Sequence, residues 1–336
     1  MTFAISAQGV QAAAGRLQGH LVRTPLLSSV ALDAAVGGRV LIKAEGLQTC
    51  GSFKLRGAMN ALLCLSSAQR EKGVVAFSSG NHAQAVAEAA RRLKVPATIV
   101  MPGDAPAIKR ARTAALGAEL VLYERGKQSR EEIAGEIAER TGASLIPSFN
   151  HADVMAGQGT LGLEVLEQCA EQGAPLPDQW VVCCSGGGLL AGIATAVKAQ
   201  TPLARLYGAE PAGHDDLARS LAAGELLANT GPEQGLCDAL LAPKTGSLIW
   251  PILQAHLSGG VVADDLQVQQ AMLWAFEELG LVVEPGGAVA LAAVLAGKLS
   301  LANKTTLVVL TGSNVDAALY AQCLAEGGRQ RPAIFT

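Results

Sequence analysis

Aromatic and charged side chains are both scarce in this sequence of 336 residues. Phe, Trp and Tyr make up 4% of it, Asp, Glu, Lys and Arg make up 16%, and the formal net charge is −3. A surface that stacks nucleic-acid bases needs aromatic residues, and one that binds polyanions needs clustered lysines and arginines. The sequence has no basic run, so we expect no nucleic-acid partner.

Cysteines are too irregular for a disulfide framework. Seven occur without a C-x-x-C pair, and Cys183-Cys184 lies in an apolar run that favours two buried thiols. The first residues show no basic segment followed by a long apolar core, and no uncharged stretch is long enough to cross a bilayer. We therefore expect a reduced, cytoplasmic location and no membrane partner.

Apolar residues make up half of the sequence, and they recur in short runs between helical patterns. Strands are predicted at residues 40–43, 74–77, 97–101, 119–123, 144–147, 180–184, 204–209 and 305–310. Helices are predicted at residues 6–18, 58–65, 107–116, 129–141, 161–171, 190–199, 264–279 and 288–296, with another after residue 82; residues 220–260 are less regular. Short strands alternating with helices indicate parallel β-α-β units, and the length suits two α/β domains.

The stretch GSFKLRGA, residues 51–58, follows the first predicted strand. Its Lys54 stands next to Phe53, between glycines that allow a close approach of backbone or ligand. Burial lowers the pKa of a lysine and makes it a nucleophile for carbonyl groups. From this stretch alone, an ordinary loop lysine between a strand and a helix is the alternative.

A second stretch, residues 185–189 (SGGGL), joins a predicted strand to a predicted helix. Bare backbone N–H groups and the positive end of a helix dipole form a cradle suited to a phosphate. The stretch matches neither G-x-x-x-x-G-K-[ST] nor G-x-G-x-x-G, and the sequence has no G-x-S-x-G elbow of a serine hydrolase. A flexible turn is the alternative.

Three further loops follow predicted strands. Residues 78–82 (SSGNH) offer donors to a carboxylate or a ring hydroxyl, or cap the next helix. Residues 311–314 (TGSN) place a hydroxyl where it can bond a ligand nitrogen. Glu210 and Asp216 supply oxygens of the kind divalent cations prefer, although a solvated acidic loop explains them as well. Open α/β sheets bind ligands at this edge, beyond the carboxyl ends of the strands.

A lysine able to form an imine and a phosphate cradle together indicate pyridoxal phosphate. Five segments then agree in order with one family: residues 51–58, 78–82, 156–160 (AGQGT), 185–189 and 311–314. Through them the chain resembles the fold-type II pyridoxal-phosphate enzymes, and among these the serine/threonine dehydratase and serine racemase group. The resemblance spans nearly the whole chain.

This resemblance implies an α/β fold similar to tryptophan synthase β, with two open, twisted, mostly parallel sheets and the cofactor in the cleft between them. Residues 1–64 plus 151–336 would form the large cofactor-binding domain, and residues 65–150 a small inserted domain. A homodimer is also implied. The chain leaves no room for the regulatory domain of biosynthetic threonine deaminases, which favours a role in amino-acid catabolism.

The resemblance also assigns residues to the cofactor. Lys54 would hold it as a Schiff base and abstract the substrate α-proton. Phe53 would pack near the ring, Asn81 would bond the ring hydroxyl, and Thr311 would face the pyridine nitrogen. The phosphate would be held by Ser185, Gly186, Gly187, Gly188 and Leu189.

The substrate would be an amino acid, and its carboxylate would be received by the residues at one loop, namely Ser78, Ser79, Asn81 and His82. Ser79 matches the serine that handles protons on the opposite face in serine racemases. Arg130 resembles an arginine of serine racemases that would attract a second carboxylate, as in 3-hydroxyaspartate; a solvated arginine at a helix start is the alternative. Residues 239–246 lack the serine that racemases place near the substrate.

A divalent cation is the last implied ligand. Glu210, Asp216 and the carbonyl of His214 match the family's site for Mg²⁺, Mn²⁺ or Ca²⁺. Some relatives use a monovalent ion or none.

We therefore expect a lyase that eliminates water from L-threonine or L-serine and releases a 2-oxo acid and ammonia. Two alternatives stay open. One is a serine racemase or 3-hydroxyaspartate dehydratase on the same scaffold. The other is a binding protein that keeps the cradle without the chemistry.

Overall fold

The strands form two separate sheets in the computed structural model, which describes residues 3–78, 80–105 and 107–329. The six-stranded sheet has the order β1-β2-β10-β7-β8-β9, and the four-stranded sheet has the order β5-β4-β3-β6. The first contains β1 (Leu26–Ser28), β2 (Arg39–Ala44), β7 (Gln179–Cys183), β8 (Arg205–Pro211), β9 (Gly259–Ala263) and β10 (Thr305–Leu310). The second contains β3 (Val74–Phe77), β4 (Ala97–Pro102), β5 (Glu119–Tyr123) and β6 (Ser144–Leu145).

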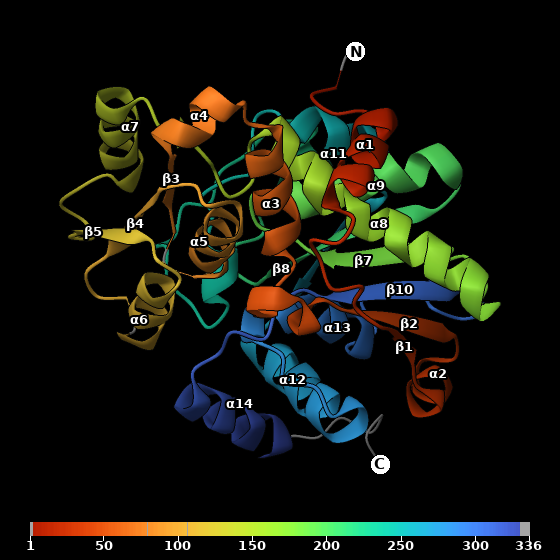
Figure 1. Cartoon of the computed structure of the whole chain (residues 1–336). Helices are drawn as coiled ribbons and strands as arrows, with labels where there is room; N and C mark the ends of the chain where they lie inside the picture. Colours follow the sequence, from red (N-terminus) through yellow and green to blue (C-terminus); the bar gives the residue numbers. More distant parts are fainter. Residues whose placement is uncertain (1–2, 79, 106, 330–336) are drawn as a thin grey trace.

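Helices cover both faces of the six-stranded sheet (Figure 1). One face packs against α1 (Ala7–Leu17), α8 (Ala152–Gln172), α9 (Gly188–Gln200) and α11 (Trp250–His256). The other packs against α2 (Val30–Val36), α12 (Asp265–Leu279), α13 (Pro285–Leu295) and α14 (Ala317–Arg329). All pairs are parallel except the edge pair β1–β2. A parallel sheet buried on both faces explains the continuous apolar runs that the sequence shows.

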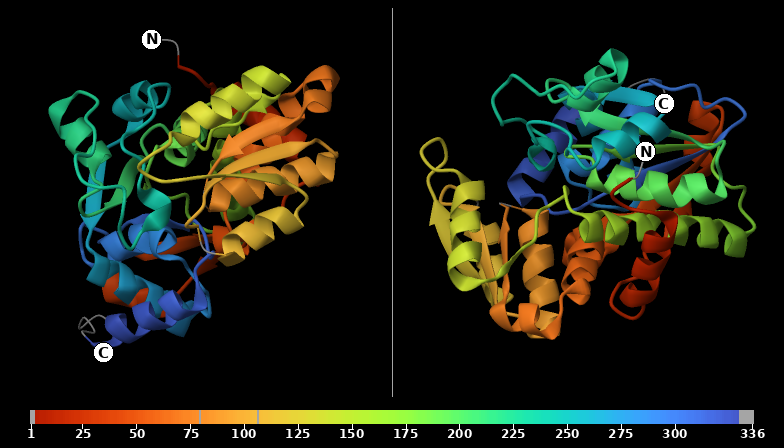
Figure 2. Two further views of the ribbon diagram at one scale, coloured as in Figure 1. Left: turned by 90° about the vertical axis from the view of Figure 1, so that its left-hand side faces the viewer. Right: turned by 90° about the horizontal axis from the view of Figure 1, so that it is seen from above.

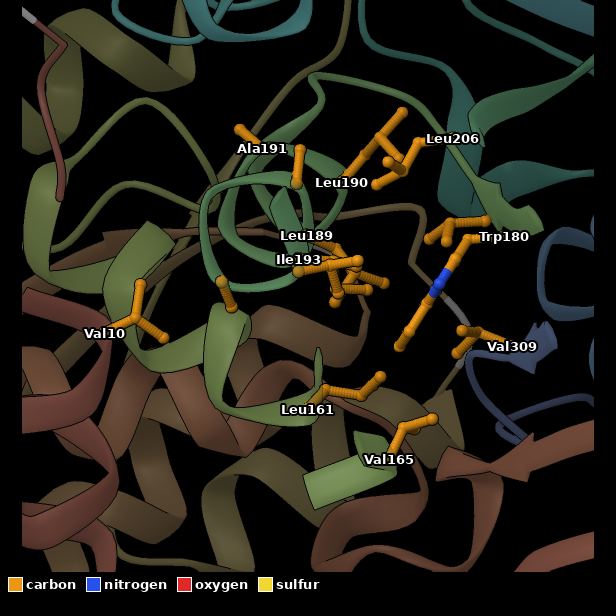
Figure 3. Close-up of a cluster of buried hydrophobic side chains, with 14 of the residues drawn as sticks. Val10, Leu161, Val165, Trp180, Leu189, Leu190, Ala191, Ile193, Leu206 and Val309 are labelled. Carbon is orange, nitrogen blue, oxygen red and sulfur yellow. The ribbon is translucent and has the colours of Figure 1, made fainter. Parts of the chain in front are cut away.

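The period-two geometry of a strand divides its side chains between the two cores. In β7, Trp180 and Val182 lie in the core beneath α8 and α9, whereas Val181 and Cys183 lie in the core against α13. Figure 3 shows Trp180 and Val309 of adjacent strands meeting the side chains of α8 and α9. This layer places the first turn of α9 directly over the sheet.

The four-stranded sheet is wholly parallel and lies at the other side of the molecule (Figures 1 and 2). One face packs against α3 (Lys54–Cys64) and α5 (Asn81–Leu93), and the other against α7 (Arg130–Thr141). Its remaining helices are α4 (Ser67–Lys72) and α6 (Ala107–Ala115). All four strands lie within residues 65–150, the range predicted for the small domain.

Several boundaries differ from the sequence prediction. The helix predicted at residues 161–171 begins earlier than expected: residues 156–160 lie inside α8, which begins at Ala152, because tight packing against other helices overrides the poor helix propensity of glycine. Residues 220–260 contain α10 (Asp216–Ala223), the 3-10 turn η3 (Asp238–Leu240), α11 and β9. The 3-10 turns η1 (Glu45–Leu47) and η2 (Thr49–Gly51) precede α3.

The cysteines agree with the sequence prediction, and α7 has a side-chain cap. Ser129 caps α7 through its hydroxyl, which accepts from the Glu132 N–H. All seven cysteines are free thiols, and Cys183 and Cys184 are buried. Among the helices of the described ranges, none combines the length and the apolar character that crossing a bilayer requires.

Candidate active site

Lys54 is the first residue of α3, and the preceding Ser52 forms a β-bridge with Gly312 beyond the end of β10. The Lys54 Nζ donates a hydrogen bond of 3.0 Å to the Ser148 carbonyl and lies 5.1 Å from the centre of the Phe53 ring. Burial lowers the pKa of Lys54 to about 8, while the charge of Glu284 opposes that shift. A substantial fraction of the amine is therefore unprotonated and nucleophilic near neutral pH.

The glycine loop at residues 185–189 joins β7 to α9. Gly187 has a φ of +86°, a left-handed conformation that favours glycine. At Gly186, an added Cβ would overlap the ring of Phe149. The Ser185 hydroxyl accepts from the Ala242 N–H at 3.1 Å, which fixes the start of the loop. The first N–H groups of α9 have no acceptor inside their own helix, and the helix dipole adds positive potential there.

Glu284, immediately before α13, belongs to the same site although the sequence interpretation did not select it. Asn81 donates to its Oε1 at 2.6 Å, and Asn314 donates to the Asn81 Oδ1 at 2.7 Å. Burial raises the pKa of Glu284 to about 8, against the lowering effects of the Asn81 hydrogen bond and of Lys54. In the sequence, Glu284 could have been recognised as an acidic residue between Val283 and a predicted apolar helix.

Ser78 directly follows β3, and His82 lies in the first turn of α5, where the charge of Lys54 acts on its ring. The Ser78 hydroxyl accepts from the Gly80 N–H at 3.2 Å, and the buried His82 ring has its Nε2 2.8 Å from the Ile146 carbonyl. Burial, followed by the charge of Lys54, lowers the pKa of His82 to about 3. His82 is therefore neutral near pH 7, and with so low a pKa it is too weakly basic to serve well as a general base. Ser79 lies outside the described residues.

Thr311 is buried directly after β10 and contacts two parts of the site. Its carbonyl accepts from the Phe53 N–H at 3.1 Å, and its own N–H donates to the Gly287 carbonyl at 3.4 Å. These two hydrogen bonds hold Thr311 between Phe53, next to Lys54, and Gly287 in the first turn of α13. The two segments are far apart in the sequence and meet because β10 lies next to β2.

Arg130, the first residue of α7, lies at the end of β3 that leads into Ser78. Its guanidinium carbon is 5.9 Å from the centre of the Phe77 ring, and its Nε donates to Glu131 at 2.8 Å. A longer ion pair of 3.8 Å joins it to Glu233. The side chain is 30% exposed, so it rests on an aromatic face at the margin of the site and is not a freely solvated arginine.

Glu210 and Asp216 lie in a separate group at the end of β8. The Glu210 carboxylate accepts from the Leu217 and Ala218 N–H groups, and the Asp216 carboxylate accepts from Thr245 and Asn229. Burial, and then the neighbouring Asp216, raise the pKa of Glu210 to about 8. Burial also raises the pKa of Asp216.

His214 is less involved in this group: its ring nitrogen is 3.2 Å from the Pro232 carbonyl. Within residues 3–78, 80–105 and 107–329, no cluster of three His, Cys, Asp or Glu side chains is arranged to hold a metal ion. The predicted ligand set contains two carboxylates and the backbone carbonyl of His214, so a cation there would depend on a main-chain oxygen.

Comparison with known proteins places this geometry in context. A family model described as "Pyridoxal-phosphate dependent enzyme" matches residues 17–312. L-threo-3-hydroxyaspartate ammonia-lyase of Pseudomonas sp is 43% identical over 312 residues, which cover 93% of this chain and 96% of that protein.

Solved structures share the same fold. Maize serine racemase superimposes with a TM-score of 0.89 at 38% identity, covering 97% of this chain and 99% of that one. A threonine deaminase from T.th. superimposes with a TM-score of 0.86 at 43% identity, covering 93% of this chain and 99% of that one. The predicted fold, the α/β architecture of the fold-type II enzymes, is confirmed.

Proposed function

Since this chain belongs to the pyridoxal-phosphate dependent enzymes, we propose that it is an ammonia-lyase that eliminates water from a 3-hydroxy amino acid. Elimination across the Cα–Cβ bond, followed by hydrolysis, gives a 2-oxo acid and ammonia. The observation that carries this proposal is the amine of Lys54, which is desolvated, lies beside Glu284 and has a pKa of about 8. A lysine with these properties is suited both to a carbonyl group and to a proton.

The residues of the site fit pyridoxal phosphate. Lys54 offers a nucleophile for its aldehyde, and the glycine loop before α9 offers N–H groups for its phosphate. A Cβ at Gly186 would overlap the ring of Phe149, so the loop needs glycine at this position. When bound, the group supplies an electron sink for the bonds of the substrate α-carbon.

Residues of this chain then have distinct tasks. Lys54 would attach the cofactor and remove the α-proton, while Ser79 would handle protons on the opposite face. Phe53 would pack near the ring, and Thr311 would face its nitrogen. The residues that would hold the phosphate are Ser185, Gly186, Gly187, Gly188 and Leu189.

The loop at the start of α5 binds the substrate carboxylate through its hydroxyl and N–H groups, at the positive end of the helix. Ser78 and the backbone of His82 contribute donors. Asn81 orients the ring hydroxyl, and its bond to Glu284 holds the amide in place for that contact. The neutral His82 keeps further positive charge away from Lys54.

For the substrate, we propose 3-hydroxyaspartate ahead of the L-threonine and L-serine that the sequence first suggested. Arg130, half-buried on Phe77 at the end of β3, is placed for a second carboxylate. The similarity to L-threo-3-hydroxyaspartate ammonia-lyase of Pseudomonas sp supports the same choice. L-Serine and L-threonine remain as slower substrates in this proposal.

The deciding experiment measures 2-oxo acid release by purified protein with added pyridoxal phosphate. The panel contains the isomers of 3-hydroxyaspartate, L-serine, L-threonine and D-serine, with Lys54→Ala as the control and chiral analysis of residual serine. Preferred turnover of L-threo-3-hydroxyaspartate supports the proposal. Turnover of L-threonine or L-serine alone returns the substrate to the first expectation. Racemisation without 2-oxo acid, or no reaction with cofactor attached at Lys54, refutes the lyase.

We also propose a divalent cation, Mg²⁺, Mn²⁺ or Ca²⁺, at Glu210, the His214 carbonyl and Asp216. Two neighbouring buried carboxylates favour a cation, since Asp216 helps to raise the pKa of Glu210 and the hydrogen bonds described to both come from neutral groups. A homodimer in the cytoplasm completes the proposal. Thermal melting with each cation tests the cation site. Light scattering on the loaded enzyme tests the homodimer.

A further inference from the structure

The AGQGT segment, residues 156–160, has no part in the chemistry proposed above, yet its glycines are closely packed. A Cβ on Gly157 would lie 2.5 Å from the Arg56 carbonyl oxygen and 2.8 Å from the Gly57 Cα, both in α3. A Cβ on Gly159 would lie 2.6 Å from the Gly192 carbonyl oxygen in α9. Real Cβ atoms do not come so close to backbone. Both helix crossings therefore require glycine.

Hydrogen bonds fix the position of α8 along α3. The Gly57 N–H donates to the Gln158 Oε1 at 3.2 Å, and the Asn60 side chain donates to the Asp153 carbonyl at 2.7 Å. Gln158 is 1% exposed, and its Nε2 has no hydrogen-bond partner in the described part of the chain. A buried amide with one group unsatisfied is costly, so the hydrogen bond that Gln158 accepts from α3 offsets part of that cost and ties the two helices together.

The two helices that α8 contacts carry the two halves of the cofactor site. Lys54 begins α3, and the glycine loop leads into α9. Helix α8 packs against both of them, as Figure 1 shows. Just before α8, the Ser148 carbonyl accepts from Lys54 Nζ, and the Phe149 ring lies against Gly186.

We propose that Gly157, Gln158 and Gly159 are positioning residues that set the distance between the Lys54 amine and the phosphate cradle at residues 186–188. The inference rests on the proposed function, because it assumes a ligand held at both ends. Gly157 and Gln158 fix α3 on α8, and Gly159 fixes α9 on the same helix. A helix is stiff over a few turns. The distance along α8 between its contact with α3 and its contact with α9 therefore determines the distance between the first residues of α3 and α9.

The test separates the two ends of the ligand. Pyridoxal phosphate needs both the lysine and the cradle, whereas pyridoxamine phosphate has the phosphate and the ring but no aldehyde. We would measure the rate of borohydride-stable attachment of pyridoxal phosphate at Lys54 by peptide mass spectrometry, and the Kd of pyridoxamine phosphate by calorimetry. The variants are Gly157→Ala and Gly159→Ala. The control is Gly162→Ala on the same helix, where the nearest atom to a Cβ is a Val197 methyl at 3.2 Å.

We expect attachment in Gly157→Ala and Gly159→Ala to slow by about tenfold or more, because a displacement below 1 Å suffices for such losses. The Kd of pyridoxamine phosphate should change by less than about threefold, a small free-energy difference. Gly162→Ala should match the wild type in both. Unchanged attachment, or equal losses for both ligands, would overturn the inference.

A second variant covers the case in which the alanines prevent folding. Gln158→Met keeps the volume and removes the acceptor for the Gly57 N–H, so attachment should slow while pyridoxamine phosphate still binds. If Gln158→Met behaves as the wild type, the positioning role is wrong. Failure of the wild type to attach pyridoxal phosphate at Lys54 is a different result, since it refutes the proposed function itself.

Discussion

Lys54 and Glu284 set the proton chemistry at the scale of single residues. Burial moves their pKa values towards each other, down for the amine and up for the carboxyl, until both lie at about 8. Two neighbouring groups with matched pKa values exchange a proton at little cost near neutral pH. Asn81 holds one oxygen of Glu284, which keeps the carboxyl in a fixed orientation.

This pair predicts the pH dependence of cofactor attachment in cofactor-free protein. The attacking form is the neutral amine, so the rate should rise with pH and level off above about 8. In Glu284→Gln the midpoint should move to lower pH, because the carboxylate charge raises the pKa of Lys54. Stopped-flow absorbance between pH 6 and 10 measures both curves, with Asp104→Asn as an exposed control. A midpoint at 10.5, the ordinary value, would contradict the burial argument.

Arg130 predicts substrate preference. Arg130→Ala should lower kcat/KM for L-threo-3-hydroxyaspartate by roughly 10- to 100-fold, because a charge-assisted hydrogen bond contributes about 1.5–3 kcal/mol. The value for L-serine should stay within about threefold, since serine has no second carboxylate. Arg125→Ala is the matched control, because Arg125 pairs with Asp104 in the same part of the chain. Equal losses on both substrates would assign Arg130 a structural role.

At the scale of elements, α8 also carries part of a buried ion network. Arg56 of α3 pairs with Glu45 at 2.7 Å and with Glu164 of α8 at 3.0 Å. Lys43 of β2 pairs with the same Glu164 and also donates to the carbonyl of Thr24. Two cations and two carboxylates therefore balance their charges in a largely buried region, and the balance depends on Glu164.

Glu164→Gln should lower the free energy of unfolding by about 3 kcal/mol, because it leaves two buried cations with one carboxylate. Glu171→Gln on the same helix should change it by less than about 1 kcal/mol, since the pair with Arg23 is exposed. Urea unfolding followed by circular dichroism measures both variants. Similar losses in the two would show that burial does not determine the effect.

The sequence predicted elements best where one local pattern was sufficient. The strands at residues 74–77, 119–123 and 305–310 have the predicted bounds, since each is a short, mostly apolar run between polar or small residues. The start of α8 was predicted too late, because the glycines at residues 156–160 allow close packing with α3 and α9. The spacing of residues in the sequence does not reveal that packing. Glu284 was missed for a related reason: its partner Asn81 is 203 residues away in the chain.

For the whole molecule, ion pairs connect the helices of the four-stranded sheet to the loop near η3. Lys109 of α6 pairs with Asp238 at 3.0 Å, and Arg130 of α7 approaches Glu233. Asp238 is 56% exposed, so water and salt weaken its pair. These contacts join the two parts of the chain, whose closure over a substrate would exclude water.

We therefore expect the radius of gyration of the loaded enzyme to fall when a substrate analogue binds. Lys109→Ala should be more expanded than the wild type without ligand and equal to it with ligand. Small-angle scattering measures both states. An identical radius in every state and variant would show that the two parts do not move.

The position of β10 has a consequence for the synthesis of the protein. This strand, formed by residues 305–310, lies in the six-stranded sheet between β2 and β7, which are made much earlier. Until a ribosome has released residue 310, both neighbours expose an unpaired edge, and the bridge from Ser52 to Gly312 is absent. The nascent chain can therefore complete neither its sheet nor its lysine site before β10 and Gly312 emerge, and until then it depends on protection from aggregation.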